Sequence, residues 1–403
     1  MSWEKVTIKS VCKGIYDGPH ATPPMSDNGA IFLGISNFSN GRLDFSEIRY
    51  ISENDLSKWT KRVTPQADDI VFSYEATLNL YAIIPDGFRG CLGRRMALIR
   101  VDEEKVYHKF LYYYFYSDAW RSVIQENTVL GATVDRIPLV KFPDFPVELP
   151  PLETQHRIAD ILSAYDDLVE NNRKQIKLLK EAAQRLYKEW FVDLHFPGRE
   201  HTKIVDGVPE GWRVDFLSNV VKTTSGGTPA RSHPAYYVNG SNLWVKTQEL
   251  SDGFILDTEE KITDEAMKNS SAKLVSKGSI LMAMYGATIG KLGIATQDLT
   301  CNQACCVIDV RDFKYGAMYL FCWLLENRSV LIKLGKGAAQ SNLSQSMIKN
   351  LNILVPTENV LYQFSRIVDS LYSQILIKQK QITFLSETRD RLLPKLMSGE
   401  VEV

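Results

Sequence analysis

The chain lacks a charge excess of either sign. Its 47 Lys and Arg residues are balanced by 48 Asp and Glu residues, which leaves a formal net charge of −1. A strongly basic domain is the usual footprint of a protein that binds nucleic acid. No long segment is strongly basic, so any binding to DNA would have to come from local basic clusters or from a basic partner.

Long apolar runs and a disulfide framework are also missing. No apolar run reaches 18 residues, and neither a signal peptide nor a lipidation motif is recognisable, so we expect a cytoplasmic protein without a membrane partner. Four of the six cysteines (Cys301, Cys305, Cys306 and Cys322) lie in apolar stretches, with no second pair or histidine at zinc spacing. We therefore expect buried cysteines and no metal site.

Catalytic motifs are nearly absent. The segment Gly286–Lys291 resembles a phosphate loop, but it has one residue too few between its glycines, and Leu292 stands where Ser or Thr should hold magnesium. Pro85-Asp86 followed by Glu103 and Lys105 resembles a nuclease pattern, whose carboxylates must converge on a metal. Here Glu103 and Lys105 lie in the segment 102–105, which is predicted to lead into a capped helix over 106–116. We therefore expect a chain that is not an enzyme.

What the sequence does contain is a long internal repeat. The second half follows the first after about 206 residues, with little side-chain identity but similar turns and chain breaks. The paired positions include Trp3 and Trp212, Asp69 and Ser279, and Gly131 and Gly337. A period of this length indicates a duplicated domain, so the molecule is predicted to perform one task twice.

A long helical pattern follows each copy. Its apolar residues step by three and four, which is typical of a coiled-coil seam. The seam residues are Leu162, Tyr165, Val169, Asn172, Ile176 and Leu179 in the first helix and Leu371, Ile375, Lys378, Ile382 and Leu385 in the second. The polar breaks at Asn172 and Lys378 coincide, and a lone polar residue in a seam fixes register. The seams predict an antiparallel pair with these two residues near its middle; the alternative is that each helix packs only on its own domain.

Each globular segment contains short strands and turns instead of regular βαβ alternation. Strands are predicted over 70–74, 96–101, 280–285 and 304–310. We predict an α+β fold with globular domains over 1–150 and 198–355 and long helices over 151–197 and 356–403. The helices would pack as an antiparallel coiled coil with pseudo-two-fold symmetry.

Two helix motifs resemble the specificity subunit of type I restriction-modification enzymes. They are the run from Pro150 to Leu162, continued by 167–179 and 186–192, and the related run 382–400. In that family two target recognition domains are separated by two long helices. The resemblance covers nearly the whole chain and assigns 1–150 and 198–355 as target recognition domains and the two helices as spacers.

The resemblance implies a non-catalytic subunit that binds double-stranded DNA at a bipartite site. Each recognition domain would read one half-site, and the helices would dock two adenine-methylating subunits. Restriction subunits that translocate DNA would join this core. S-adenosylmethionine, ATP and magnesium would then be bound by the partners and not by this chain. The alternatives are a duplicated protein–protein scaffold without DNA binding and the recognition portion of another restriction-methylation system.

Candidate DNA-binding residues come from Gly-rich and polar segments that resemble recurring family segments. Arg and Lys can bind guanine or phosphate, and Asn and Gln can pair with adenine. The candidates are His20, Thr22, Asn37, Tyr74, Arg94 and Arg95 in the first domain and Arg231, Lys246, Thr247, Tyr285, Thr288, Lys291, Gln303, Gln340 and Asn342 in the second. Because these segments differ between the copies, the two domains are expected to read different sequences.

Overall fold

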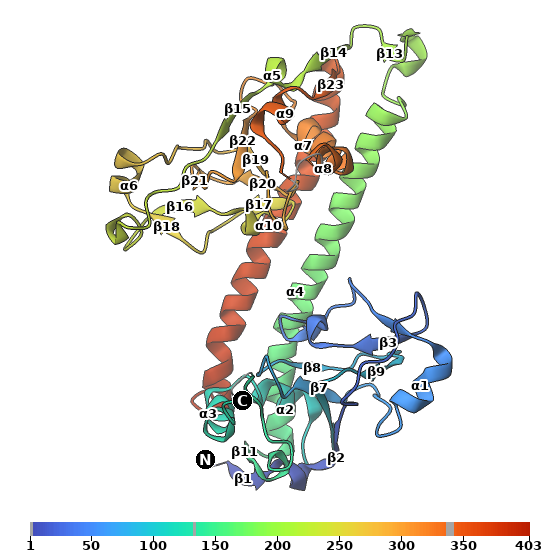
Figure 1. Cartoon of the computed structure of the whole chain (residues 1–403), viewed down its shortest axis with the longest axis vertical. Coiled ribbons are helices and arrows are strands. Elements are labelled where there is room, and N and C mark those ends of the chain that lie inside the picture. The colour runs from blue at the N-terminus through green and yellow to red at the C-terminus, as the bar shows by residue number, and fades with distance from the viewer. Residues whose placement is uncertain (1–2, 132–133, 336–341) are drawn as a thin grey trace. The chain divides into compact units, whose positions relative to one another are not determined.

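A four-stranded antiparallel sheet forms the centre of the first domain (Figure 1). Its strand order is β2 (Cys12–Asp17), β10 (Met96–Val101), β7 (Ile70–Ser73) and β8 (Tyr81–Ile83). The computed structural model describes residues 3–131, 134–335 and 342–403. All four residues of β7 are buried, which explains why its first three residues, Ile70–Phe72, are apolar without alternation. The strands predicted over 70–74 and 96–101 are confirmed.

Smaller sheets surround this central sheet. One contains β6 (Tyr50–Ile51), β3 (Ala30–Leu33) and β9 (Gly90–Leu92), in which β3 and β9 are parallel. Another joins β1 (Glu4–Thr7) to β11 (Pro146–Leu149), so that the start and the end of the domain pair in one ladder. The helices are α1 (Glu53–Trp59), α2 (His108–Tyr114) and α3 (Asp118–Asn127), and β4 (Phe38–Ser39) and β5 (Arg42–Leu43) form a short hairpin.

The helix predicted over 106–116 is found as α2, but it starts two residues later than predicted. The Asp102 carbonyl accepts hydrogen bonds from the backbone N–H groups of Lys105 and Val106, which makes a turn, and α2 begins only at His108. The backbone N–H of Tyr107 donates to the side-chain oxygen of Gln155 at 3.0 Å. This bond to the first long helix satisfies a donor at the helix start that no residue of α2 could satisfy.

The second domain repeats this topology with one strand added. Its sheet has the order β15 (Lys222–Ser225), β22 (Cys305–Asp309), β19 (Ile280–Ala283), β20 (Leu292–Ala295) and β17 (Gly253–Ile255). The first four correspond in order to β2, β10, β7 and β8. The strands predicted over 280–285 and 304–310 are confirmed with slightly shorter bounds, and the predicted repeat is confirmed as well.

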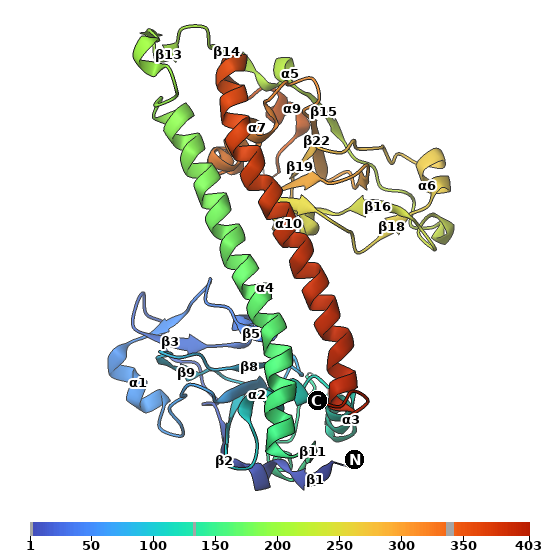
Figure 2. The ribbon, with the colours of Figure 1, turned by 180° about the vertical axis from the view of Figure 1, so that it is seen from behind.

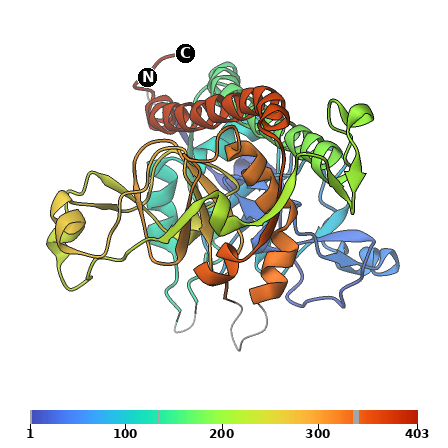
Figure 3. The same ribbon diagram turned by 90° about the horizontal axis from the view of Figure 1, so that it is seen from above.

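The small sheets repeat too. The counterpart of β6-β3-β9 contains β18 (Lys261–Ile262), β16 (Asn242–Val245) and β21 (Thr300–Cys301), with β16 and β21 parallel. The ladder of β14 (Arg213–Phe216) with β23 (Asn352–Val355) corresponds to β1 with β11. Figure 3 shows α6 (Asp264–Asn269, yellow) at the outer end of the second domain. The other elements are α5 (Leu217–Val220), α7 (Ala317–Glu326), α8 (Arg328–Gly335), α9 (Gln345–Lys349), β12 (Ile204–Val205) and β13 (Val208–Pro209).

The two long helices are α4 (Leu152–Tyr187), which ends in a π-helical turn over Lys188–Val192, and α10 (Glu358–Met397). Figure 2 shows α10 as one continuous helix. At about 1.5 Å per residue, each helix is roughly 54–60 Å long. The chain divides into unit 1, residues 1–169 and 384–403, and unit 2, residues 170–383. Each unit thus contains one domain, part of its own following helix and part of the other helix.

The helices pack antiparallel, as predicted. In unit 1 the beginning of α4 meets the end of α10, because Ile158 and Leu396 share one core and Asp166 pairs with Arg389. In unit 2 the end of α4 meets the beginning of α10, where the rings of Trp190 and Phe364 are 5.8 Å apart. Each unit therefore combines one domain with the beginning of one long helix and the end of the other, as the repeat predicts.

None of the predicted seam residues is exposed. Leu162, Val169, Asn172 and Ile375 are buried, and the others are partly buried. Ile176, Leu179 and Leu371 pack against the core of the second domain. The helices therefore pack both on each other and on the domains, which combines the two predicted arrangements.

Candidate nucleic-acid interface

In both domains, polar loops converge at the carboxyl ends of the two parallel strands. β16 and β21 end at Val245 and Cys301, which are neighbours in the ladder. The chain then continues into Lys246–Glu249 and Asn302–Gln303, and the backbone N–H of Asn302 donates to the Val245 carbonyl at 2.9 Å. The carboxyl ends of parallel strands meet at one edge of a sheet, so loops distant in sequence lie together there.

The first domain has the same arrangement. β3 and β9 end at Leu33 and Leu92 and lead into Gly34–Asn37 and Gly93–Arg95. The backbone N–H of Gly93 donates to the Leu33 carbonyl at 2.6 Å, as Asn302 does to Val245 in the second domain. The backbone at the ends of these strands, called the backbone frame below, is therefore arranged in the same way in both domains.

Two further loops join this edge in each domain. In the second domain the Gly227 N–H donates to the Cys301 carbonyl at 2.9 Å, and the Tyr285 hydroxyl donates to the Gln303 carbonyl at 3.1 Å. In the first domain the Gly18 N–H donates to the Met96 carbonyl at 2.7 Å, and the Tyr74 N–H donates to the Arg95 carbonyl at 3.1 Å. A side chain at Gly18 would clash with the Gly93 carbonyl, which would lie 2.4 Å from its Cβ. This close backbone approach explains the glycine.

The structure brings together many of the sequence-predicted residues at these edges. They are Asn37, Tyr74, Arg94 and Arg95 in the first domain and Lys246, Thr247, Tyr285, Gln303 and Asn342 in the second. Asn342 joins through a β-bridge to Tyr285. Gln340 lies outside the described residues.

The remaining candidates lie on neighbouring loops. His20 and Thr22 are exposed on the segment that follows β2, and the His20 imidazole lies 3.0 Å from Asp17. Thr288 lies on the loop between β19 and β20, where its carbonyl accepts from the Lys291 N–H at 2.9 Å. Arg231 lies on the segment between β15 and β16. The structure therefore does not gather all the candidates at the strand ends.

Asn37 has a structural role in its own turn. Its side-chain oxygen accepts from the Gly34 N–H at 3.0 Å, and its side-chain nitrogen donates to the carbonyls of Asp44 and Glu47. The residue is 2% exposed. Both polar atoms of the amide thus make hydrogen bonds within the domain, so Asn37 stabilises the turn. The Tyr74 hydroxyl is likewise buried, and no described residue makes a hydrogen bond with it.

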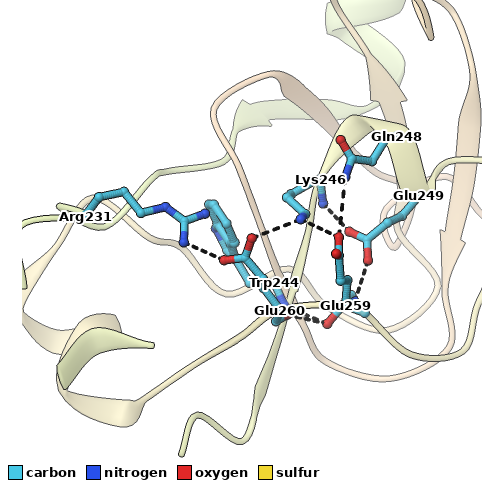
Figure 4. Close-up of polar contacts among 8 residues, drawn as sticks. Arg231, Trp244, Lys246, Gln248, Glu249, Glu259 and Glu260 are labelled. Carbon is cyan, nitrogen blue, oxygen red and sulfur yellow. Dashed lines mark hydrogen bonds and ion pairs between the residues drawn. The ribbon is translucent and has the colours of Figure 1, made fainter. Parts of the chain in front are cut away.

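Lys246 and Arg231 belong to a charged cluster in the second domain (Figure 4). The Lys246 amine lies 2.7 Å from Glu259 and 3.0 Å from Glu260, and the Arg231 guanidinium lies 2.6 Å from Glu260. Hydrogen bonds from Arg231 and Lys246 lower the pKa of Glu260, and those to Glu259 and Glu260 raise the pKa of Lys246. Both cations are therefore neutralised by carboxylates of the same domain.

Aromatic rings hold the guanidinium of Arg231. It lies 4.2 Å from the ring centroid of Tyr237 and 5.2 Å from that of Trp244. The Trp244 side chain is anchored by its N–H, which donates to the Gly227 carbonyl at 3.0 Å. Cation–π contacts of this length add to the ion pair and fix the direction of the side chain.

Lys291 lies in a different ion-pair network. Its amine is 3.1 Å from Asp252, whose carboxylate also pairs with Arg328. Hydrogen bonds from Arg328, the Leu292 N–H and Lys291 lower the pKa of Asp252 although burial opposes this. Lys180 of α4 lies near the same charges, and burial lowers its pKa. Lys291 therefore lies close to the helix side of unit 2.

Cations also occur in the first domain. Arg94 is exposed, whereas Arg95 adopts a positive φ of 71° and lies 3.2 Å from Glu75. Arg49, which sequence reasoning missed, is exposed and lies over the Phe32 ring at 5.1 Å. Sequence reasoning placed Gln248 in a candidate segment without choosing it as a site residue, and it missed Glu259. Phe32 and Trp244 are equivalent positions of β3 and β16, and each ring has an arginine over it.

The described residues contain no group of three or more His, Cys, Asp or Glu that could hold a metal ion. Cys301, Cys305, Cys306 and Cys322 are free and buried, as predicted. Burial raises the pKa of the Cys306 thiol to about 12. Among the described helices, none is long and apolar enough to cross a membrane.

Comparison with known proteins gives one family. The profile described as "Type I restriction modification DNA specificity domain" matches residues 2–181 and again 209–386. The MjaIX specificity subunit of Methanocaldococcus jannaschii is 27% identical over 361 residues, which cover 88% of this chain and 82% of that protein. The putative MjaX specificity subunit of the same organism is 23% identical over 411 residues, covering 100% of this chain and 94% of that protein.

A solved structure has the same fold. The S subunit of a type I restriction-modification system from M. genitalium superposes with a TM-score of 0.60 at 15% identity, covering 98% of this chain and 96% of that chain. The two profile matches fall on the two copies of the repeat, each with most of the helix that follows it. The chain thus belongs to the family of type I restriction-modification specificity subunits.

Proposed function

We propose that this specificity subunit reads a bipartite site in double-stranded DNA, with one half-site bound by each domain. The supporting observation is the repeated convergence of four loops at the carboxyl ends of a parallel strand pair. The backbone frame is the same in both domains, whereas the exposed side chains differ. A shared frame with different side chains is suited to reading two different sequences, because base edges are distinguished by donor and acceptor patterns.

The two long helices dock two copies of an adenine-methylating subunit. Leu178 of α4 and Phe384 of α10 are equivalent positions of the repeat, and they are 63% and 67% exposed. Exposed large apolar side chains at equivalent places are suited to two copies of one partner. Restriction subunits that use ATP and magnesium join this core, and S-adenosylmethionine is bound by the methylating subunits.

The docking proposal is tested with Leu178→Asp and Phe384→Asp. Each change should weaken one of the two sites for the methylating subunit by about 30- to 150-fold, the equivalent of roughly 2–3 kcal/mol for a buried apolar anchor. Thr383→Asp is the matched control, because it places the same charge at an exposed neighbouring position. Unchanged affinity and stoichiometry in both variants, measured by calorimetry, would contradict the docking proposal.

The reading proposal is tested by mapping methylated adenines in DNA that has been exposed to the complex with the methylating subunit. A split motif with a fixed gap is expected. Binding of a duplex with this motif should weaken as salt rises, because phosphate contacts release counterions. A chain that shows no salt-sensitive DNA affinity, even with the methylating subunit present, is a protein scaffold instead.

A further inference from the structure

The turns after β3 and β16 are two copies of one structural element. Each is a 3₁₀ turn, over Ile35–Asn37 in the first domain and Thr247–Glu249 in the second. In each, the last side chain accepts from the backbone N–H of the residue before the turn. Asn37 accepts from Gly34 at 3.0 Å, and Glu249 accepts from Lys246 at 2.6 Å. The backbone of the turn is therefore fixed in the same way in both domains.

The middle residue of each turn is exposed and differs between the domains. It is Ser36 in the first domain and Gln248 in the second. Each turn follows a strand that ends among the converging loops described above. Because the backbone of the turn is fixed and its middle residue differs, the two domains expose different hydrogen-bonding groups at equivalent positions.

In the second domain the Gln248 side chain is held by a chain of polar contacts (Figure 4). Its amide nitrogen donates to Glu259 at 3.5 Å, and the same carboxylate oxygen lies 2.7 Å from the Lys246 amine. Glu259 is itself tied to the turn, because its backbone N–H donates to Glu249 at 2.7 Å. With one amide hydrogen pointing to Glu259, the other hydrogen and the amide oxygen remain for a ligand. That is the donor and acceptor pair that an adenine edge requires.

In the first domain an exposed cation lies beside the turn. Arg49 occupies the position of Glu260 in the repeat, since the following residues, Tyr50 and Lys261, begin β6 and β18. Its guanidinium lies against Gly34, because a Cβ built on Gly34 would be 2.5 Å from Nη2. Among the described residues, no carboxylate lies within ion-pair distance of Arg49. An exposed guanidinium without a carboxylate can pair with both acceptors of a guanine edge.

We propose that these two turns and the side chains beside them form the base-reading elements of the two domains. Gln248, on the second turn, would contact an adenine in one half-site, and Arg49, which lies against the first turn at Gly34, would contact a guanine in the other. Lys246 and Glu259 are positioning residues that orient the Gln248 amide. The inference rests on the proposed function, and it adds which residues set the specificity of each half-site.

The charge balance of the cluster supports a positioning role for Lys246. The Lys246 amine pairs with Glu259 and Glu260, and Arg231 pairs with Glu260. The Glu249 carboxylate accepts from the Lys246 backbone N–H, so the cluster has no excess of positive charge. A lysine that is already paired with two carboxylates attracts a phosphate weakly, because the phosphate would have to compete with them. Lys246 should therefore affect the selection of a base more than the salt dependence of binding.

The first test uses the full chain in complex with its methylating subunit and duplexes that carry every single base-pair change in the mapped motif. Gln248→Ala should reduce discrimination at one A·T pair of one half-site by about 5- to 150-fold, the range for one bidentate contact. Discrimination in the other half-site should stay unchanged. Gln297→Ala is the matched control, because Gln297 is exposed before the amino end of β21, away from the converging strand ends.

Arg49→Ala should lower discrimination at one G·C pair of the opposite half-site, again by about 5- to 150-fold. Arg89→Ala is the control, because Arg89 precedes the amino end of β9 and pairs with Glu53. If Gln248→Ala and Arg49→Ala leave discrimination unchanged at every position, the inference is overturned while the bipartite reading stands. If wild type shows no sequence preference, the proposed function fails first.

Lys246 separates positioning from phosphate binding. Lys246→Met should lower discrimination at the Gln248 position by about 3- to 10-fold without changing the slope of log affinity against log salt, and Lys246→Arg should restore discrimination. A phosphate contact would instead reduce the slope by about one and weaken all sequences alike. That second outcome overturns the positioning role.

Discussion

The two units differ in the side chains that join the domain to the long helices. In unit 1 the domain meets the helices through buried polar groups: Asp166 pairs with Arg389 and accepts a hydrogen bond from the Tyr113 hydroxyl at 2.6 Å. The equivalent positions in unit 2 are Tyr372, Ala183 and Cys322, which lie in a continuous apolar core. Gln155, which is 1% exposed, likewise corresponds to the buried Leu361.

The difference teaches that the repeat conserves backbone geometry and not the interactions that stabilise it. A buried ion pair contributes little net stability compared with apolar packing, but it is costly to break. A buried ion pair also requires a partner of opposite charge at the contact. The end of α10 therefore carries the group that matches Asp166, whereas the end of α4 carries Ala183.

The largest effect is expected from breaking the polar contact of unit 1. Asp166→Ala leaves the Tyr113 hydroxyl and part of the Arg389 guanidinium without their acceptor, and we expect a loss of about 3 kcal/mol in the free energy of unfolding. Tyr372→Phe in unit 2 should cost less than about 1 kcal/mol. Urea unfolding, followed by hydrogen exchange of the backbone amides of α2 and α7, measures the loss of stability in the two variants.

Asp167→Ala is the control for that comparison, because Asp167 is the exposed neighbour of Asp166. Equal losses for Asp166→Ala and Asp167→Ala would contradict the structural role of the pair.

The next effect concerns the turns. Asn37→Ala removes an amide that makes three hydrogen bonds in a buried site, so we expect about 2 kcal/mol of destabilisation. Glu249→Ala, at the equivalent place but less buried, should cost about 1 kcal/mol. Thermal unfolding compares them, with the exposed Asn28→Ala as control. A smaller effect at Asn37 than at Glu249 would be inconsistent with this comparison.

The polar break in the helix seam is expected to have a moderate effect. Asn172 is buried close to the middle of α4, and Asn172→Leu should raise the free energy of unfolding by about 1 kcal/mol while allowing other assembly states. Asn171→Leu, at the exposed neighbouring position, should change neither. Light scattering measures the assembly state, and urea unfolding measures the stability. If both are unchanged in Asn172→Leu, Asn172 has no role in fixing the helix register.

Lys291→Ala should have a small effect on folding. Arg328 still pairs with Asp252, so we expect less than about 1 kcal/mol of destabilisation. DNA binding should weaken, and the salt slope should fall by about one if the amine contacts a phosphate. If neither affinity nor sequence preference changes, Lys291 is only part of the ion-pair network.

The smallest effect is expected from pH. Because the Arg231 and Lys246 hydrogen bonds lower the pKa of Glu260, their contribution is present above the ordinary glutamate range and is lost only as the pH falls through this lowered value. The base preference attributed to Gln248 should therefore be constant between about pH 6 and 8. A change in preference across this range, measured with the duplex panel, would show that another group controls it.

Much of the fold could be predicted because its signals are local. The apolar run of β7, the strand β10 and the three-and-four spacing of the seams each follow from short stretches of sequence. The duplication then gave the order of domains and helices. The start of α2 was missed because its first donor is satisfied by Gln155, which is 48 residues away in the chain.

The site was harder to predict, since its residues are defined by contacts between distant segments. Asn37 was chosen as a reader for its chemistry, but its amide is used inside the turn. Lys246 was chosen for its charge, but Glu259 and Glu260 neutralise it. Arg49 was missed because its contact with Gly34 is seen only in the folded domain, and its equivalence to Glu260 only when the two folded domains are aligned.

The most direct test of the account maps methylated adenines for the wild-type complex beside the Gln248→Ala and Arg49→Ala complexes. We predict a split wild-type motif in which the first variant relaxes one half and the second relaxes the other. A motif in which both variants relax the same half, or a wild-type motif without two halves, would contradict the claim that two copies of one frame read two different sequences.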